Sequence, residues 1–367
     1  MYPHAENADN QHVDPKGYRK KVSENPFEDN PSPVRDKSLS PTPSSSTSST
    51  NGNLSENLCP AYFNDFERWC EECVMVSDKL SGLPVPFRLN APQRRLARIM
   101  ERQRLEGKPV RIILLKARQW GGSTLVQVYM AWHQLVRQKG RNALVCAHVK
   151  DAAALIRSTY SLLLASYPDH LKDSSPAEWK LKPYQQTQGT LWIPPRQARL
   201  AITSANNPDS LRGASYHLAH LSEAAFWGDG DPQAASAIVR PVCGTVPATP
   251  DTVIVVESTA NGPDNWFAAE WRRAVEGKSD KTPVFVPWHE IEIYRHPLSE
   301  QERRGLPSQL DDYELKLLGR GVSAEALAWY HRKRREYSTH AEMMAEFTPP
   351  RRKKPSPPPW QALSRRR

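Results

Sequence analysis

The feature that most constrains this chain is a short polar loop between an apolar segment and a helical pattern. The loop runs from residue 116 to residue 124 (KARQWGGST). It follows the apolar run 111–115, which has the length of a buried strand. It precedes residues 125–136, where large apolar side chains recur at helical spacing. The sequence therefore predicts a strand, a tight loop and a helix in succession.

This arrangement is suited to binding phosphate. Backbone N–H groups at the start of a helix lack partners within it, and the helix dipole adds partial positive charge there. Gly121 and Gly122 let the backbone approach phosphate oxygens, and the hydroxyl of Ser123 or Thr124 can bind Mg²⁺. We therefore predict that the loop binds a nucleotide. Its residues are Lys116, Ala117, Arg118, Gln119, Trp120, Gly121, Gly122, Ser123 and Thr124.

The loop departs from the usual pattern G-x-x-x-x-G-K-[ST]. Counting back from Ser123, Lys116 stands at the first glycine position and Gly122 at the lysine position. The ammonium of Lys116 ends a flexible four-carbon stem, so it can still curl over the β- and γ-phosphates. Without support from other segments, an ordinary glycine-containing turn is the better interpretation.

Three other segments have polar residues where a strand or helix is expected to begin or end. Residues 87–96 start a predicted helix, with Asn90 as its cap and Pro92 near its first turn. Residues 217–227 lead from a predicted strand into Ser-Glu, and residues 255–262 lead from a β-branched strand into Ser-Thr-Ala-Asn-Gly.

Taken in chain order, these three segments and the loop 116–124 resemble the motifs of the large terminase subunits, the ATPase motors that package DNA into the heads of tailed phages. The resemblance runs from about residue 87 to residue 347 and depends on the ordered set. It implies binding of ATP and Mg²⁺, with Lys116 as the phosphate lysine. It also implies that Gln93 contacts adenine, since an amide can both donate to and accept from the base. Without the resemblance, a solvated glutamine is an equally good interpretation.

Glu223 is the candidate catalytic residue. Hydrolysis needs a group that orients the attacking water, and Glu223 lies just past a predicted strand end. Most phosphate-loop ATPases have an aspartate at the position of Ser222, whose hydroxyl can hold a water on Mg²⁺ but carries no charge. We therefore predict Ser123 and, through water, Ser222 as the metal-site residues. An isolated Ser-Glu pair is more often part of a surface loop.

Two arginines are candidates to neutralise charge on the leaving phosphate. Arg118 lies within the loop, where the resemblance also places an arginine, and Arg212 precedes the strand that leads to Glu223. A correctly placed arginine contributes about 10³–10⁵ in rate. For each of them an ordinary surface charge is the alternative.

The segment 258–262 is the candidate coupling motif. By itself, Asn-Gly indicates only a turn. The resemblance implies that the segment couples hydrolysis to DNA movement. Its residues are Ser258, Thr259, Ala260, Asn261 and Gly262.

Predicted strands and helices alternate through the middle of the chain. This alternation predicts an α/β fold with a mostly parallel sheet flanked by helices, and the resemblance specifies a P-loop NTPase of the RecA/ASCE-like class. The active residues should then collect at the carboxyl ends of the strands. The predicted strands span residues 111–115, 143–149, 199–203, 216–221 and 252–257, and the main helices 125–136, 151–166, 266–275, 310–318 and 324–337.

Composition divides the chain into three parts. Residues 1–56 are rich in Ser, Thr and Pro, and we expect them to be disordered. Residues 57–347 form the expected ATPase domain, with a small helical subdomain at about 289–347. Residues 348–367 contain six prolines and seven of the ten net positive charges. The rest of the chain carries only +3, so bulk charge is poor evidence for DNA binding by the folded part.

The tail suggests a hypothesis about the gene. Large terminases continue into a nuclease domain, whereas here the resemblance stops at Phe347 and no acidic cluster follows. The codons cgg aag aag cct tcc would encode residues 352–356, and the same bases read two positions later would give Glu-Glu-Ala-Phe, the family's residues. We expect either a frameshift before a lost nuclease or a genuine basic arm, and the nucleotide sequence decides.

Together these observations predict a DNA-packaging ATPase without nuclease activity. The expected partners are double-stranded DNA, a portal protein, a small terminase subunit and further copies in a ring. Five cysteines without a framework spacing fit a reducing host cytoplasm, and no apolar run of about 18 residues predicts a membrane span. We interpret Cys70-x-x-Cys73 as structural. The alternatives are an inactive prophage remnant or basic DNA-binding protein, and a helicase-like repair ATPase.

Overall fold

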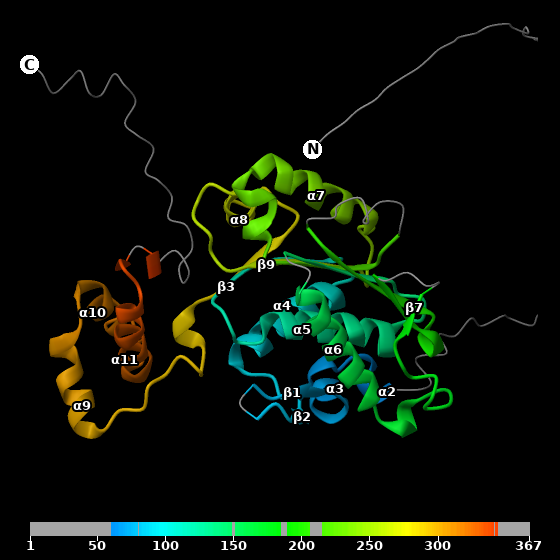
Figure 1. The fold of residues 1–367 in the computed structure, drawn as a ribbon, viewed down its shortest axis with the longest axis horizontal. Helices are drawn as coiled ribbons and strands as arrows, with labels where there is room; N and C mark the ends of the chain where they lie inside the picture. The colour runs from blue at the N-terminus through cyan, green and yellow to red at the C-terminus, as the bar shows by residue number, and fades with distance from the viewer. Residues whose placement is uncertain are drawn as a thin grey trace, which may run out of the picture. The chain divides into compact units, whose positions relative to one another are not determined.

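A sheet of eight strands organises the part of the chain that the structure describes (Figure 1). The structure is a computed structural model, and it describes residues 60–79, 81–148, 151–184, 189–205, 215–340 and 342–343. The strand order is β10-β3-β9-β8-β4-β7-β6-β5. The strands are β3 (Val110–Lys116), β4 (Ala143–Ala147), β5 (Lys182–Pro183), β6 (Thr190–Ile193), β7 (Ala198–Ser204), β8 (Leu218–Ser222), β9 (Val253–Ser258) and β10 (Thr282–Val286).

The sheet is mostly parallel, as predicted. The neighbours from β10 to β7 pair in parallel, and β6 and β5 complete the sheet in antiparallel fashion. Strands β3, β4 and β9 are buried along their whole length, which is typical of parallel strands covered on both faces. The short antiparallel strands β5 and β6 were not predicted.

Helices cover both faces of the sheet (Figure 1). One face carries α4 (Ala91–Leu105), α5 (Gly122–Trp132) and α6 (Asp151–Ala165), and the other carries α7 (Pro232–Thr245) and α8 (Trp266–Val275). Side chains of β3 alternate between two apolar cores. Ile112 and Leu114 join the first core, and Ile113 and Leu115 join the second.

The segment before α4 packs against the first core. It contains α2 (Pro60–Phe63), α3 (Phe66–Cys73) and a two-stranded antiparallel unit of β1 (Met75–Ser77) and β2 (Pro84–Pro86). Trp69, Cys70 and Cys73 of α3 are buried among apolar residues. The two thiols therefore lie in the core, in agreement with a structural interpretation of the CxxC spacing.

After the sheet, the described residues include the helices α9 (Glu300–Gly305), α10 (Asp312–Leu318) and α11 (Ala324–Lys333). The helix predicted for residues 324–337 ends early, and a 3₁₀ turn follows it. Aromatic rings hold α11 to the preceding segment. Tyr294 stacks on Trp329 with ring centroids 4.2 Å apart, and Trp288 stacks on Tyr330 at 4.4 Å. That this region forms a separate subdomain stays a prediction.

Several predictions fall outside the described residues: the disordered segment 1–56, the tail 348–367, and Arg212. Within the described residues, no helix has both the length and the apolar character needed to cross a bilayer.

Helix α5 ends before Val136, the predicted end, because the chain continues as a π-helical turn, His133–Arg137. His133 is fully buried, with its ring edge-on to those of Tyr129 and Trp132. Burial lowers the pKa of His133 to about 3. The imidazole is therefore neutral in the folded protein at any ordinary pH.

This histidine should make the fold sensitive to acid. An unfolded histidine has a pKa of about 6.5, so between about pH 6.5 and pH 3 the unfolded chain binds a proton that the folded chain does not. Stability from this source therefore falls as pH falls through that window. We expect His133→Leu to remove this dependence. Urea unfolding of both proteins between pH 7 and pH 4 measures this. The free energy of unfolding of the variant should rise relative to that of wild type as pH falls, and a constant difference would contradict this.

The central strand should be sensitive to cavity formation. Leu114 is fully buried in β3, and we expect Leu114→Ala to cost about 2–5 kcal/mol of unfolding free energy because the vacated space cannot fully collapse. The matched control is Leu105→Ala at the end of α4. Leu105 is 66% exposed, so its loss should change stability by no more than about 0.5 kcal/mol. Urea unfolding of the full chain measures both, and equal losses would refute the placement of the core.

Candidate functional site

The candidate site lies where three adjacent strands end. Strand β9 pairs with β3 on one side and with β8 on the other, all in parallel. Lys116, Ser222 and Ser258 are the last residues of β3, β8 and β9. The structure therefore brings the loop, the Ser-Glu pair and the segment 258–262 to one edge of the sheet.

The loop between β3 and α5 has the backbone of a tight turn. Gln119 and Gly121 have positive φ angles of 63° and 79°, and α5 begins at Gly122. The first N–H groups of α5, which lack helical acceptors, therefore face the loop. Of the other predicted loop residues, Ala117 and Trp120 are buried, Arg118 is exposed, and Ser123 and Thr124 are partly buried.

Gln93 is attached to this loop. Its side chain is 4% exposed, so a solvated glutamine is the wrong interpretation. Its carbonyl accepts from the backbone N–H of Asn90 at 2.9 Å, and its amide donates to the carbonyls of Trp120 at 3.3 Å and Gly121 at 3.1 Å. The visible role of Gln93 is to join the start of α4 to the loop. Contact with adenine stays a prediction.

Lys116 lies between two glutamates. Its ammonium is 2.8 Å from a carboxylate oxygen of Glu223 and 2.8 Å from one of Glu257. Burial by itself lowers the pKa of Lys116, but the charges of Glu257 and Glu223 outweigh burial and raise it above its ordinary value. Lys116 is therefore a buried cation at the edge of the sheet. A contact between its ammonium and phosphate stays a prediction.

Glu223 contacts both the loop lysine and the segment 258–262. One carboxylate oxygen accepts from Lys116, and the other accepts from the backbone N–H of Thr259 at 3.1 Å and its hydroxyl at 3.2 Å. The hydroxyl of Ser258 donates to the same oxygen at 3.3 Å. The backbone of Glu223 is also in the left-handed region, with φ of 56°. This residue is held in place from two sides and is not an ordinary solvated surface glutamate.

Glu257 is the site residue that sequence reasoning missed. It is fully buried, and one oxygen accepts from the hydroxyls of Ser123 at 2.9 Å and Ser222 at 2.7 Å. His220 lies 3.3 Å from the same oxygen. Burial tends to raise the pKa of Glu257, but the charge of Lys116 and the contacts with His220 outweigh it and lower the pKa. The two predicted metal-site serines thus meet at an ionised carboxylate.

The segment 258–262 continues from Glu223 to helix α8. Asn261 donates its side-chain N–H to the carbonyl of Ala225 at 3.1 Å. Asn265, the cap of α8, donates to the carbonyls of Asn261 at 2.7 Å and Gly262 at 3.2 Å. A continuous set of hydrogen bonds therefore runs from Glu223 through the segment to the start of α8.

Arg118 is exposed in the loop, and its backbone carbonyl accepts a hydrogen bond of 2.7 Å from the hydroxyl of Tyr294. This contact attaches the loop to the chain that leads into α9. Arg212, the second candidate arginine, is not among the described residues. The catalytic role of either arginine stays a prediction.

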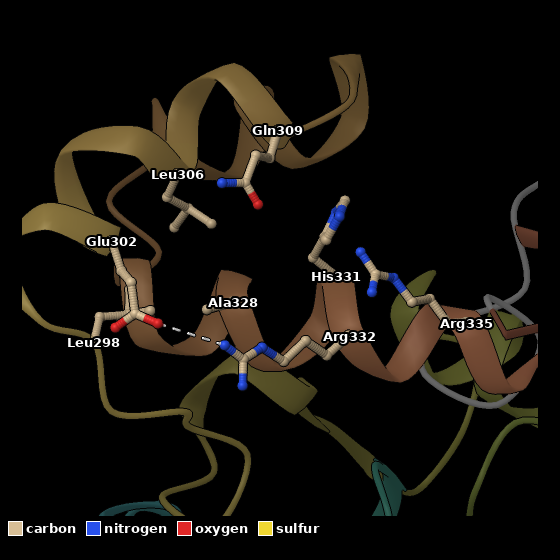
Figure 2. Close-up of a pocket in the computed structure, with 8 residues that line it drawn as sticks. All are labelled: Leu298, Glu302, Leu306, Gln309, Ala328, His331, Arg332 and Arg335. Atoms are coloured by element: carbon tan, nitrogen blue, oxygen red, sulfur yellow. Dashed lines mark ion pairs between the residues drawn. The ribbon is translucent and has the colours of Figure 1, made fainter.

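Basic residues of α11 and of the 3₁₀ turn after it line a cavity of about 460 Å³ shown in Figure 2. Acidic partners offset much of their charge. Arg332 lies 3.8 Å from Glu302, His331 bonds Glu314, and Arg334 pairs with Asp311. These contacts favour a solvated, internally paired helix over a DNA-binding face. The cavity is lined by Leu298, Glu302, Leu306, Gln309, Ala328, His331, Arg332 and Arg335.

The fold and the loop define a class. A mostly parallel sheet covered by helices, with a strand, a glycine-containing loop and a helix at its carboxyl edge, is the architecture of a P-loop NTPase. Residues 113–348 match the family described as terminase large subunit, T4likevirus-type, N-terminal. This match covers more than half of the chain, and the chain belongs to that family.

Several solved structures are similar to this chain. The large terminase of bacteriophage HK97 matches with a TM-score of 0.51 and 16% identity, over 77% of this chain and 54% of its own. This chain thus spans about half the length of that relative. The large terminase ATPase domain of Thermus phage P74-26 matches at 0.39 with 18% identity, over 65% of this chain and 86% of its own. The large terminase of bacteriophage D6E in complex with ADP matches at 0.39 with 12% identity, over 62% and 51%.

The residues present at the site fit a nucleotide with Mg²⁺. A Cβ added to Gly122 would lie 2.5 Å from the ring of Trp120, so a larger residue at this position would have to displace that ring. The hydroxyls of Ser123 and Ser222 and the carboxylate of Glu257 form an all-oxygen group, and oxygen ligands are those that Mg²⁺ prefers.

The contact between Gln93 and the loop predicts coupled substitutions. A Cβ on Gly121 would lie 2.7 Å from the Gln93 amide nitrogen, whereas one on Gly107, which has a similar positive φ of 68°, meets nothing within 4 Å. Gly107→Ala should therefore cost only the backbone strain, about 1–2 kcal/mol. We expect Gly121→Ala to cost more, and Gln93→Ala to recover part of that extra loss in the double variant. Urea unfolding of the four variants tests this, and strictly additive effects at 93 and 121 would contradict it.

Proposed function

We propose that this chain is the ATPase motor subunit of a DNA-packaging terminase. The carrying observation is the position of Glu223, which contacts the loop lysine with one oxygen and the segment 258–262 with the other. One side chain is thereby in contact with both the expected hydrolysis site and the expected coupling segment. Membership of the terminase large-subunit family supports the same proposal.

In this proposal the loop binds ATP. The backbone N–H groups at the start of α5 and Lys116 bind the phosphates. Gln93 contacts adenine when its amide exchanges a bond to a loop carbonyl for one to the base. Ser123 and Ser222 hold Mg²⁺, Ser222 through water. When bound, Mg²⁺ neutralises charge on the phosphates.

Glu223 then orients the attacking water. The hydrogen bonds from Thr259 and Ser258 fix one of its oxygens, and release of the other from Lys116 makes that oxygen available to accept a proton. Arg118, on the exposed part of the loop, neutralises charge on the leaving phosphate, with Arg212 as the second candidate.

Coupling follows from the same contacts. A shift of the Glu223 carboxylate changes the hydrogen bonds to Thr259, and the connected bonds of Asn261 and Asn265 pass that change to α8. We propose that this movement drives double-stranded DNA into a procapsid when copies form a ring on a portal protein, with a small terminase subunit as a further partner.

The proposal predicts a specific loss of turnover. We expect Glu223→Gln to lower steady-state ATP hydrolysis by the full chain with Mg²⁺ about 10²–10⁴-fold, since the amide cannot accept the proton. Glu106→Gln is the matched control, because Glu106 is exposed at the end of α4, and it should keep wild-type turnover. Circular dichroism melting of both variants checks folding.

The response to DNA separates the candidate functions. Stimulation by double-stranded DNA supports the packaging motor, and stimulation by single-stranded DNA alone would favour a helicase-like ATPase. Turnover that is absent, or indifferent to Glu223→Gln, would contradict the proposed catalytic site and favour an inactive remnant.

A further inference from the structure

At the position of Ser222, this site lacks the negative charge that P-loop NTPases usually have there. In P-loop NTPases an aspartate at the end of a strand helps the loop Ser or Thr to hold Mg²⁺. Here that strand is β8, and its last residue is Ser222, which has no charge. Either the metal is held weakly, or a carboxylate reaches the same place from another strand.

Glu257 reaches that place from β9. It is the residue directly opposite Ser222 in the parallel pairing of β8 with β9. The hydroxyl of Ser222 donates to the carboxylate of Glu257 at 2.7 Å, and the hydroxyl of Ser123, the loop serine, donates to the same oxygen at 2.9 Å. The carboxylate therefore stands next to both residues that are expected to meet the metal.

The direction of these hydrogen bonds is favourable. A serine hydroxyl that donates its proton to a carboxylate keeps its oxygen lone pairs for a cation. The bond from Ser123 to Glu257 therefore does not compete with a bond from the same oxygen to Mg²⁺. Carboxylates that hold metal ligands in this way fix their orientation and raise their affinity for the metal.

Other residues keep this carboxylate in place. Glu257 is fully buried, and its second oxygen lies 2.8 Å from the ammonium of Lys116. Because Lys116 also pairs with Glu223 at 2.8 Å, the cation is shared and does not cancel the charge of Glu257 alone. One negative charge remains in the group formed by Lys116, Glu223 and Glu257.

We propose that Glu257 replaces the missing aspartate of β8, orienting Ser123 and Ser222 around Mg²⁺ and supplying the negative charge that Ser222 lacks. The inference rests on the proposed function, because it concerns the metal of a bound nucleotide. It makes Glu257 a positioning residue of the metal site, in contrast to a purely structural partner of Lys116.

The test compares nucleotide affinity with and without metal. ADP is the probe, and its dissociation constant for the full chain is measured by titration calorimetry in Mg²⁺ and in EDTA. The Mg²⁺ gain is the factor by which Mg²⁺ tightens ADP binding relative to EDTA. Glu257→Gln should reduce this gain by about 10–100-fold, while ADP affinity in EDTA changes little. Ser222→Asp combined with Glu257→Gln restores a carboxylate from β8, so this double variant should recover part of the gain. Mn²⁺ binding in the presence of ADP can be measured by electron paramagnetic resonance. It should be tightest for wild type, weaker for the double variant and weakest for Glu257→Gln.

A matched control is available in α10. Glu314 is also fully buried and bonds a histidine, His331, so Glu314→Gln makes the same chemical change away from the loop. It should leave the Mg²⁺ gain at the wild-type value. If Glu257→Gln does not fold, Ser222→Ala takes its place, and a smaller but metal-specific loss is expected.

Four results would overturn the inference. Equal losses in Mg²⁺ and EDTA for Glu257→Gln would make the residue a structural partner of Lys116. Unchanged ADP affinity in both Mg²⁺ and EDTA for Glu257→Gln, or a double variant no better than Glu257→Gln, would place the metal charge elsewhere. These three results leave the proposed ATPase standing, because wild type still binds ADP. Failure of the wild-type chain to bind ADP at all would reject the proposed function and this inference together.

Discussion

The buried ion pair between Lys116 and Glu257 is the interaction on which the edge of the sheet depends. Both side chains lie at the carboxyl ends of central, apolar strands, where an unpaired charge has no water to solvate it. Removing one member of such a pair typically costs about 3–5 kcal/mol. The strands β3 and β9 therefore keep their carboxyl ends together, and Glu223, Ser123 and Ser222 are arranged around a polar centre that the apolar sheet itself holds in place.

Local patterns in the sequence predicted much of this arrangement. The buried strands β3, β4 and β9 are short apolar runs, and the loop at 116–124 has its glycines and hydroxyls within a few residues. Such signals depend on neighbours in the chain, so they can be read without the fold. The topological rule that parallel strands end at one edge then correctly placed Glu223 and the segment 258–262 beside the loop.

Contacts between distant residues were beyond that reasoning. Glu257 follows four β-branched residues and reads as part of a core strand, while its partners Ser222 and Ser123 lie 35 and 134 residues away. The sequence leaves Gln93 with either adenine or solvent as its contact, because its bonds to carbonyls 27 and 28 residues away depend on how α4 packs. Strands β5 and β6 are too short, and one contains proline, for an alternating pattern to appear.

The hydrogen bond from Tyr294 to the loop ends on the backbone carbonyl of Arg118 and not on its side chain. The hydrogen bond that holds the loop here, which we call the tether, is therefore separate from the guanidinium of Arg118. An exchange of the guanidinium for another side chain leaves the tether intact, whereas loss of the phenol hydroxyl loosens the loop and keeps every charge. The side chain at position 118 can thus change during evolution while the hydrogen bond from Tyr294 to the loop is kept.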